Sequence, residues 1–294
     1  MARINLEGVR RASHAGSWYS AGSEVLNSEL DSYLAAAPVT HPRTKMIIGP
    51  HAGYEYSGPT AAWSYKNIDV SQYSTVFLLG PSHHSYIKGC SLPCSGIYST
   101  PIGEIPIHMH IVGDLMQNTK FTMLKKRDEE KEHSLEMHLP YLRKIFGNKQ
   151  FQLVPIMVGD INVQTAKEYG RILAGYFRNP ENLFVISSDF CHWGDNFDFK
   201  PYDRSKGQIF EFIEFLDRSG MGFIEKNDLE GFAKYLDSTG NTICGCNPIM
   251  IAMSTIAESG LEVETTFVRY AQSNPVRNQR EFSVSYAASV TYLK

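Results

Sequence analysis

The sequence lacks several features that would place it in a specialised class of protein. No run approaches 18 apolar residues, so no membrane-spanning helix is expected. The amino-terminal stretch MARINLEGVRRASHAG has no apolar core of a secretory signal, so a secreted protein is not expected. No basic cluster is interleaved with aromatic residues, and the formal net charge of the 294 residues is only -3. Neither nucleic-acid binding nor insertion into a membrane is therefore expected.

Cysteine is scarce and odd in number. Five cysteines in a chain long enough to form its own core indicate free thiols in a reducing cytoplasmic or nuclear compartment. Cys90 and Cys94 lie in a turn-rich stretch, but a zinc knuckle needs a second pair at matching spacing. Cys244 and Cys246 do not provide that spacing, so a structural zinc site is not expected.

Short apolar runs alternate along the chain with longer amphipathic segments. We predict buried strands at residues 46–48, 76–79, 153–158 and 183–186, and two further strands at 265–270 and 283–292. Amphipathic spacing predicts helices at residues 24–36, 137–146, 163–177, 203–216, 228–236 and 248–258. The charged run at residues 125–133 predicts a solvated loop or a helix start. We expect one α/β domain over residues 1–294, with a central, mixed, largely buried sheet and helices on both faces.

Histidines follow three of the four predicted core strands. His51 comes after Gly-Pro, His83 and His84 come after Gly-Pro-Ser, and His192 comes after Ser-Ser-Asp. In open α/β sheets ligands bind beyond the carboxyl ends of the strands, so these imidazoles are expected to converge. Imidazole is the commonest metal ligand and an acid/base group near neutral pH. A hydrogen-bonded structural histidine is the alternative for any single one.

Two other groups of residues frame these strand ends. EHSLEMHLP places His133, Glu136 and His138 near a helix start, at a spacing that is not the zincin motif. Glu136 either interacts with the positive end of that helix or supports a metal or substrate site from behind. The aromatic residues near the glycine-rich turns either wall a ligand pocket or pack in the core; they are Trp18, Tyr54, Tyr56 and Trp193.

Eight segments together resemble the Memo family, named for a mediator of receptor-tyrosine-kinase-driven cell motility. They are ASHAGSWY, PHAGYEYSG, LGPSHH, EHSLEMHLPY, FVISSDFCHWG, NTICG, YAQS and SVSYAA, and they extend from about residue 12 to the carboxyl terminus. The resemblance implies a fold similar to the class III extradiol ring-cleaving dioxygenases. Those enzymes hold non-haem Fe(II) with two histidines and one carboxylate.

The resemblance implies a set of metal ligands. His51 and His83 correspond to the two ligand histidines, and Cys244 stands where the dioxygenases have their carboxylate. His192 corresponds to a position near their acid/base histidine, with Asp189 beside it. Two imidazoles and a thiolate suit one iron(II) or copper ion per chain, and also suit zinc. Because the thiolate is oxidisable and replaces a carboxylate, ring cleavage does not follow from the similarity in fold.

Two functions are consistent with these residues and the resemblance. The first is a metal-dependent redox protein linked to cell motility, in which His192 and Asp189 handle protons; whether it is an enzyme is left open. The second is a non-catalytic module whose pocket receives a phosphotyrosine-containing receptor peptide or a small aromatic ligand. No arginine, the usual phosphate ligand, lies in the strand-end motifs. The expected ligand contacts are Trp18, Tyr54, His84, His133 and Trp193.

Overall fold

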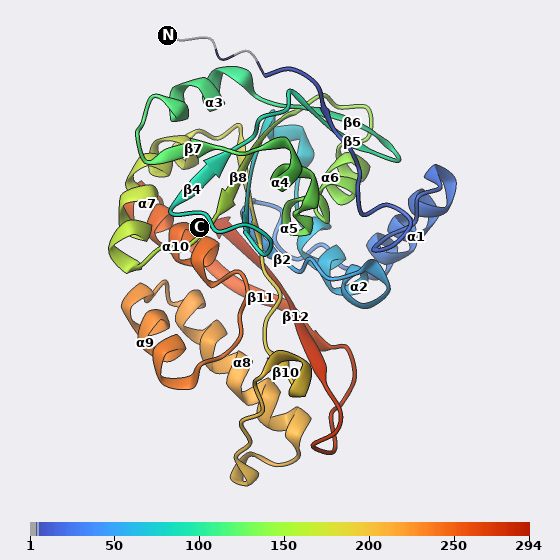
Figure 1. Ribbon diagram of the computed structural model, residues 1–294, viewed down its shortest axis with the longest axis vertical. Coiled ribbons are helices and arrows are strands. Elements are labelled where there is room, and N and C mark those ends of the chain that lie inside the picture. Colours follow the sequence, from blue (N-terminus) through green and yellow to red (C-terminus); the bar gives the residue numbers. More distant parts are fainter. Residues whose placement is uncertain (1–3, 5) are drawn as a thin grey trace.

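A nine-stranded mixed sheet crosses the middle of the protein in the computed structural model, which describes residue 4 and residues 6–294 (Figure 1). Its four central strands are parallel and are ordered β2 (Thr44–Gly49), β9 (Asn182–Ser187), β3 (Thr75–Pro81) and β8 (Gln152–Val158). These strands are almost wholly buried, as their apolar sequences predict. The expected domain and the expected absence of a signal both include residues 1–3 and 5, which lie outside the described residues.

Antiparallel pairing makes the sheet mixed at both edges. β12 (Ser283–Leu293) pairs with β2, with β11 (Val263–Gln272) and, at its amino end, with β10 (His192–Trp193). At the other edge β4 (Cys90–Leu92) is antiparallel to β8 and parallel to β7 (Phe121–Met123). A separate small sheet contains β1 (Val9–Arg10), β5 (Ile97–Thr100) and β6 (Gly103–Pro106). The predicted mixed α/β architecture is confirmed. The strands of the small sheet were not predicted, because strands of two to four residues are too short to show an alternating pattern in the sequence.

Helices cover both faces of the central sheet (Figure 1). On one face α7 (Val163–Arg178) packs on α10 (Cys246–Ser259), and both contact β9. On the other face α2 (Tyr54–Tyr65) packs on β2 and β12, with α1 (Ser23–Ala36) and α6 (Leu139–Phe146) against it. The remaining helices are α3 (Met109–Met116), α4 (Lys126–Lys131), α5 (His133–Glu136), α8 (Ile209–Glu225) and α9 (Leu229–Thr239).

Capping residues fix the ends of several helices. The side chains of Asn162 and Asp228 each accept a backbone N–H in the first turn of α7 and α9. The predicted start of α8 at residue 203 is wrong. Gly207, with φ of +95°, interrupts the chain after a short 3-10 turn, and Gln208 with Glu211 then forms a capping box that starts the helix at Ile209.

The sequence does not predict α2, because a glycine and a proline within it disfavour helix. Packing explains why the helix forms. A Cβ atom on Gly58 would lie 2.7 Å from Cε2 of Tyr33, so only glycine lets α1 approach α2 this closely. Contact between the two helices therefore offsets the low intrinsic helix propensity of this stretch.

Two further observations bear on the sequence-based expectations. All five cysteines are free thiols. None of the helices in the described part of the chain combines the length and the hydropathy that a membrane span requires.

Candidate metal centre

The carboxyl ends of two parallel strands and the segment before α10 bring candidate ligands to one edge of the sheet. His51 lies two residues beyond β2, His83 lies two residues beyond β3, and Cys244 reaches the same edge from the segment before α10. The ligand atoms of these three residues all lie within 4.8 Å of one another. Convergence of His51 and His83 at the strand ends therefore follows the topology that the sequence predicts.

Hydrogen bonds select the tautomer of His51, a buried residue. Its Nδ1 lies 2.6 Å from Oγ of Ser187, and that hydroxyl donates to the carbonyl of Ser134 at 2.7 Å. Because the hydroxyl proton is used there, Ser187 accepts the proton of His51 Nδ1. The lone pair of His51 is then on Nε2, which lies 3.2 Å from Sγ of Cys244.

A buried carboxylate plays the same part for His83. The backbone N–H and Nδ1 of His83 both contact the Glu132 carboxylate, at 2.6 and 2.8 Å. Burial alone would raise the pKa of Glu132, but the hydrogen bond from His83 and the charges of His83 and His133 bring it to about 2. The ionised carboxylate accepts the Nδ1 proton and leaves Nε2 of His83 free to bind a ligand. The side chain of His83 is 27% exposed, so this position opens to solvent.

A glycine allows Cys244 to approach the end of β9. A Cβ atom on Gly245 would lie 2.3 Å from Cβ of Ser188, so a larger residue would force the segment away. The backbone N–H of Asp189 donates to Sγ of Cys244 at 3.3 Å. Burial raises the pKa of the Cys244 thiol well above its usual value, and the Asp189 carboxylate adds to this effect. A cation bound here would displace the thiol proton, since coordinating thiols are deprotonated.

His133 lies between two other rings beside this cluster. Its imidazole lies 4.3 Å from the Trp18 ring and 4.5 Å from the His83 ring, measured between centroids, and 5.7 Å from His84. Burial lowers the pKa of His133 to about 3, so it is neutral at pH 7. Its Nδ1 has no hydrogen-bond partner among the described residues. Three of the five expected ligand contacts therefore lie side by side at the cluster.

The other two expected ligand contacts belong to the core. Tyr54 is 3% exposed, and its hydroxyl donates to the carbonyl of Met137. Trp193 is completely buried, and its indole N–H donates to the carbonyl of Pro201 at 2.8 Å. The expectation that the Trp193 ring walls a ligand pocket is corrected by this position, since no face of the indole is accessible.

A surface cavity of about 450 Å³ opens directly beside the cluster. Its walls come from the segments after β3 and β8 and from the start of α10. The polar side chains in these walls are Ser82, His83, His84, Ser85, Tyr86, Asp160, Cys244 and Asn247. The cavity gives a small polar ligand access to the exposed side of His83.

His192 and Asp189 are close in sequence but make separate hydrogen bonds. Nδ1 of His192 lies 2.8 Å from the carbonyl of Phe190 and 3.1 Å from that of Thr242, so it donates to them and leaves Nε2 free. The carboxylate of Asp189 accepts the backbone N–H of His51 at 2.9 Å. Within the described residues no hydrogen bond joins Asp189 to His192. Asp189 thus fixes the segment after β2, and the acid/base roles of the pair stay predictions.

The sequence does not reveal a buried ionic network behind the cluster. The guanidinium of Arg10 pairs with Glu136 at 2.7 Å and donates to the backbone carbonyls of Glu129 and Glu132, both at 2.9 Å. The charged run starts the helix α4, as one of the two predicted alternatives states, but its Glu129 and Glu132 are 2% and 1% exposed and so are not solvated. The burial of Arg10 could not be predicted from the sequence, because its partners lie more than 100 residues away in the chain.

Asp217 is a buried carboxylate behind the segment that carries His192. It accepts the backbone N–H of Cys191 at 3.1 Å, the Asn241 amide at 3.0 Å and the Tyr270 hydroxyl at 2.9 Å. Burial raises the pKa of Asp217 from 3.8 to about 6, and the hydrogen bonds offset only part of that cost. Between pH 3.8 and about 6 the Asp217 carboxyl is protonated in the native state but largely ionised in the unfolded chain. The contribution of Asp217 to stability is therefore present in acid and is lost as the pH rises through about 6.

We expect this linkage to be visible in the variant Asp217→Asn. Asparagine keeps the acceptor for Cys191 and cannot ionise, so its burial cost does not change with pH. The free energy of unfolding of the wild type, relative to the variant, should fall by about 2–3 kcal/mol from pH 4 to pH 7. Urea unfolding of both proteins across this range provides the measurement, and a difference independent of pH would contradict the assignment.

Comparison with known proteins identifies relatives over almost the whole chain. The family model described as "Memo-like protein" matches residues 10–290. "Protein MEMO1" of Danio rerio is 43% identical over 284 residues, and that of Homo sapiens is 42% identical; each match covers 95% of this chain and 96% of the relative. "Protein memo-1 homolog" of Caenorhabditis elegans is 42% identical, covering 98% of this chain and 83% of its own. The crystal structure of an uncharacterized Escherichia coli K12 protein has a TM-score of 0.50 at 15% identity, covering 83% of this chain and 99% of that one, which shows a shared fold.

Proposed function

The chain belongs to the family of Memo-like proteins, and from this premise we propose that it is a metal-binding, redox-linked protein. In this proposal His51, His83 and Cys244 hold one iron or copper ion. The observation that carries it is the convergence of their ligand atoms within 4.8 Å, with the Nδ1 atom of each histidine already engaged. The family resemblance and the five free thiols favour a role in cell motility signalling in a cytoplasmic or nuclear setting.

The donor set fits such an ion. Two imidazole nitrogens and one thiolate form a soft set that suits Cu(I), Cu(II) or Zn(II) and can also hold Fe(II). Three protein ligands leave a coordination position open, and His83 faces the adjacent cavity. When bound, iron or copper supplies a one-electron redox couple, which zinc does not.

The surrounding residues have separable tasks in this proposal. Ser187 and Glu132 hold the Nδ1 protons of the two ligand histidines and so orient both rings. Trp18 and His133 shield the cluster on one side, and His133 stays neutral because burial lowers its pKa to about 3. His192 accepts or returns a proton at its free Nε2, because its Nδ1 is engaged by backbone carbonyls.

A phosphotyrosine-binding module is a second candidate, favoured by the cavity beside His83 and by the neighbouring Trp18 and His133 rings. No arginine lines that cavity, so the phosphate would contact the imidazoles or a bound ion. Metal-free protein that binds a phosphotyrosine peptide, and not the same peptide without phosphate, would favour this candidate over the first.

The experiment that tests the first proposal is anaerobic reconstitution. Metal-free protein is incubated with Fe(II) or Cu(I), desalted and analysed for metal and for protein. We expect about one retained ion per chain, and we expect it to remain bound through a cycle of oxidation and reduction. Failure to retain either ion would overturn the proposal, and release of the ion on oxidation would overturn its redox part.

A further inference from the structure

We propose that a cavity between α1 and α2 is a docking site for an arginine side chain in a peptide segment of a partner protein. The cavity has a volume of about 430 Å³ and is bounded by the loop of residues 16–20, by α1 and by the start of α2. Its walls are aromatic and acidic, and the side chains that matter are Trp18, Tyr19, Tyr33, Tyr54, Glu29 and Glu55. No basic side chain lines it.

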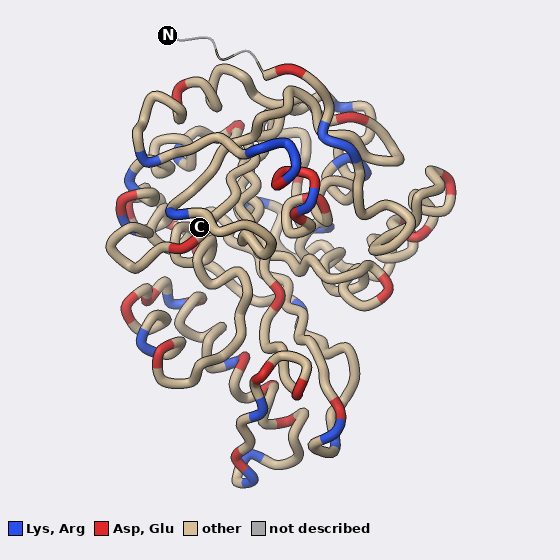
Figure 2. The backbone as a smooth tube through the Cα atoms, viewed as in Figure 1, with Lys and Arg blue, Asp and Glu red and all other residues tan. Residues whose placement is uncertain are grey.

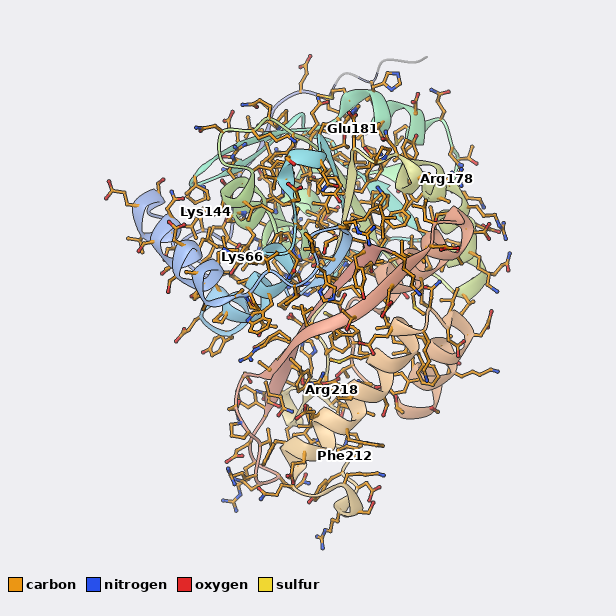
Figure 3. All side chains as sticks on the ribbon, turned by 180° about the vertical axis from the view of Figure 1, so that it is seen from behind. Lys66, Lys144, Arg178, Glu181, Phe212 and Arg218 are labelled. Carbon is orange, nitrogen blue, oxygen red and sulfur yellow. The ribbon has the colours of Figure 1, made fainter. Side chains whose placement is uncertain are left out.

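The negative charge of this cavity is not neutralised by the protein itself. Within the described residues neither Glu29 nor Glu55 forms an ion pair, and Glu29 accepts only a hydroxyl, that of Ser20 at 2.8 Å. Residues 12–42 and 46–65 contain no lysine or arginine, and Figure 2 shows acidic but no basic positions along α1 and α2. Lys144 lies beside α1 (Figure 3), but it pairs with Asp31 at 2.7 Å.

The aromatic walls select the kind of cation. Tyr19 and Tyr54 line the cavity but are only 6% and 3% exposed, and their hydroxyls donate to Glu136 and to the carbonyl of Met137. Trp18 and Tyr33 are half-buried, with ring surface left over. Glu29 and Glu55 line the same cavity as Tyr33, and burial together with their charges raises the pKa of Tyr33. A planar guanidinium both stacks on aromatic rings and forks to carboxylates, whereas a lysine ammonium does only part of this.

A second, shallower cavity extends the docking surface along α1. It has a volume of about 500 Å³, shares Glu29 and Tyr33 with the first and is otherwise lined by α1, including the 55% exposed Val25. An aliphatic side chain two positions from the arginine would lie on the same face of an extended peptide and could occupy it. Docking of such a segment requires no metal, so this inference goes beyond the proposed function and does not depend on it.

The test uses the three tryptophans of the chain as reporters. Uniformly ¹⁵N-labelled protein gives one indole N–H signal for each, and Trp18→Phe assigns the first. The probe is the peptide acetyl-Leu-Gly-Arg-amide, and its matched control carries citrulline, which keeps the shape of arginine without the charge. We expect the Trp18 signal to move on titration with the arginine peptide only. The signal of the buried Trp193 should stay fixed, which also confirms that the fold is intact.

Substitution of the carboxylates completes the test. We expect Glu29→Gln together with Glu55→Gln to weaken binding of the arginine peptide roughly fivefold to tenfold, because two partly exposed charge pairs are lost. Glu104→Gln is the matched control, since Glu104 is an exposed carboxylate that lines neither cavity, and it should leave affinity unchanged. A fixed Trp18 signal, equal binding of the citrulline peptide, or an equal loss in Glu104→Gln would each overturn the proposal.

Discussion

Replacing Cys244 with serine is expected to abolish retention of iron or copper by this protein. The thiolate is the softest of the three donors and the one whose charge a cation would balance, whereas a serine hydroxyl stays protonated and binds these ions weakly. Loss of one of the three donors should weaken metal binding on the order of 10³-fold. This estimate divides the total binding free energy of a protein metal site among its ligands. Elemental analysis after anaerobic loading and desalting should find about one ion per wild-type chain and none in the variant.

Cys246→Ser is the matched control for this experiment. Cys246 is two residues away and partly buried like Cys244, but its sulfur contacts Asn247 at 3.8 Å and does not belong to the ligand cluster. We expect this variant to retain metal as the wild type does. Equal loss in both variants, or undiminished retention in Cys244→Ser, would show that Cys244 is not a ligand.

Replacing Arg10 with methionine is expected to lower the free energy of unfolding by about 3–5 kcal/mol, because it removes the arginine partner of the buried Glu136 carboxylate, which keeps only its contacts with His14 and Tyr19. Arg10 is 1% exposed and Glu136 is completely buried. Arg10 also donates to the carbonyl of Glu129, within α4, and to that of Glu132, between α4 and α5. Urea unfolding followed by circular dichroism measures the change. Metal affinity should fall as well, since Glu132 orients His83.

Two comparisons separate the buried pair from a general effect of charge. Arg11→Met removes the neighbouring arginine, which is 80% exposed and pairs with Glu130, and should cost much less stability than Arg10→Met because solvent screens this pair. Adding Glu136→Gln to Arg10→Met removes the uncompensated charge, so the double variant should lose less stability than the two single losses added together. Equal effects of Arg10→Met and Arg11→Met would contradict the account of the network.

The parts of the fold that follow from the sequence are those with long, uniform patterns. Buried parallel strands read as continuous apolar runs, so β2, β3, β8 and β9 are predictable, and their topology places His51 and His83 together. The helix α2 is not predictable, because contact between Gly58 and Tyr33 overrides its low propensity. Charged residues are assigned to solvent by default, so the burial of Glu132 became visible only with its partners in place.

The sequence predicts the candidate metal ligands but not the residues that orient them. Histidines at strand ends and the resemblance to the Memo family pointed to His51, His83 and Cys244. The residues that set the tautomers are Ser187 and Glu132, and nothing in a single sequence distinguishes a supporting hydroxyl or carboxylate from a solvated one. Trp193 shows the converse, since an indole next to a candidate histidine can belong to the core.

The central claim is that His51, His83 and Cys244 bind one ion together, and X-ray absorption at the metal edge tests it most directly. Protein loaded anaerobically with Cu(I) is compared with an equally treated sample of Cys244→Ser. The account predicts that one sulfur and two imidazole nitrogens coordinate copper in the wild type. Any copper that the variant retains should have no sulfur ligand. A wild-type spectrum without sulfur, or with a single imidazole, would contradict it.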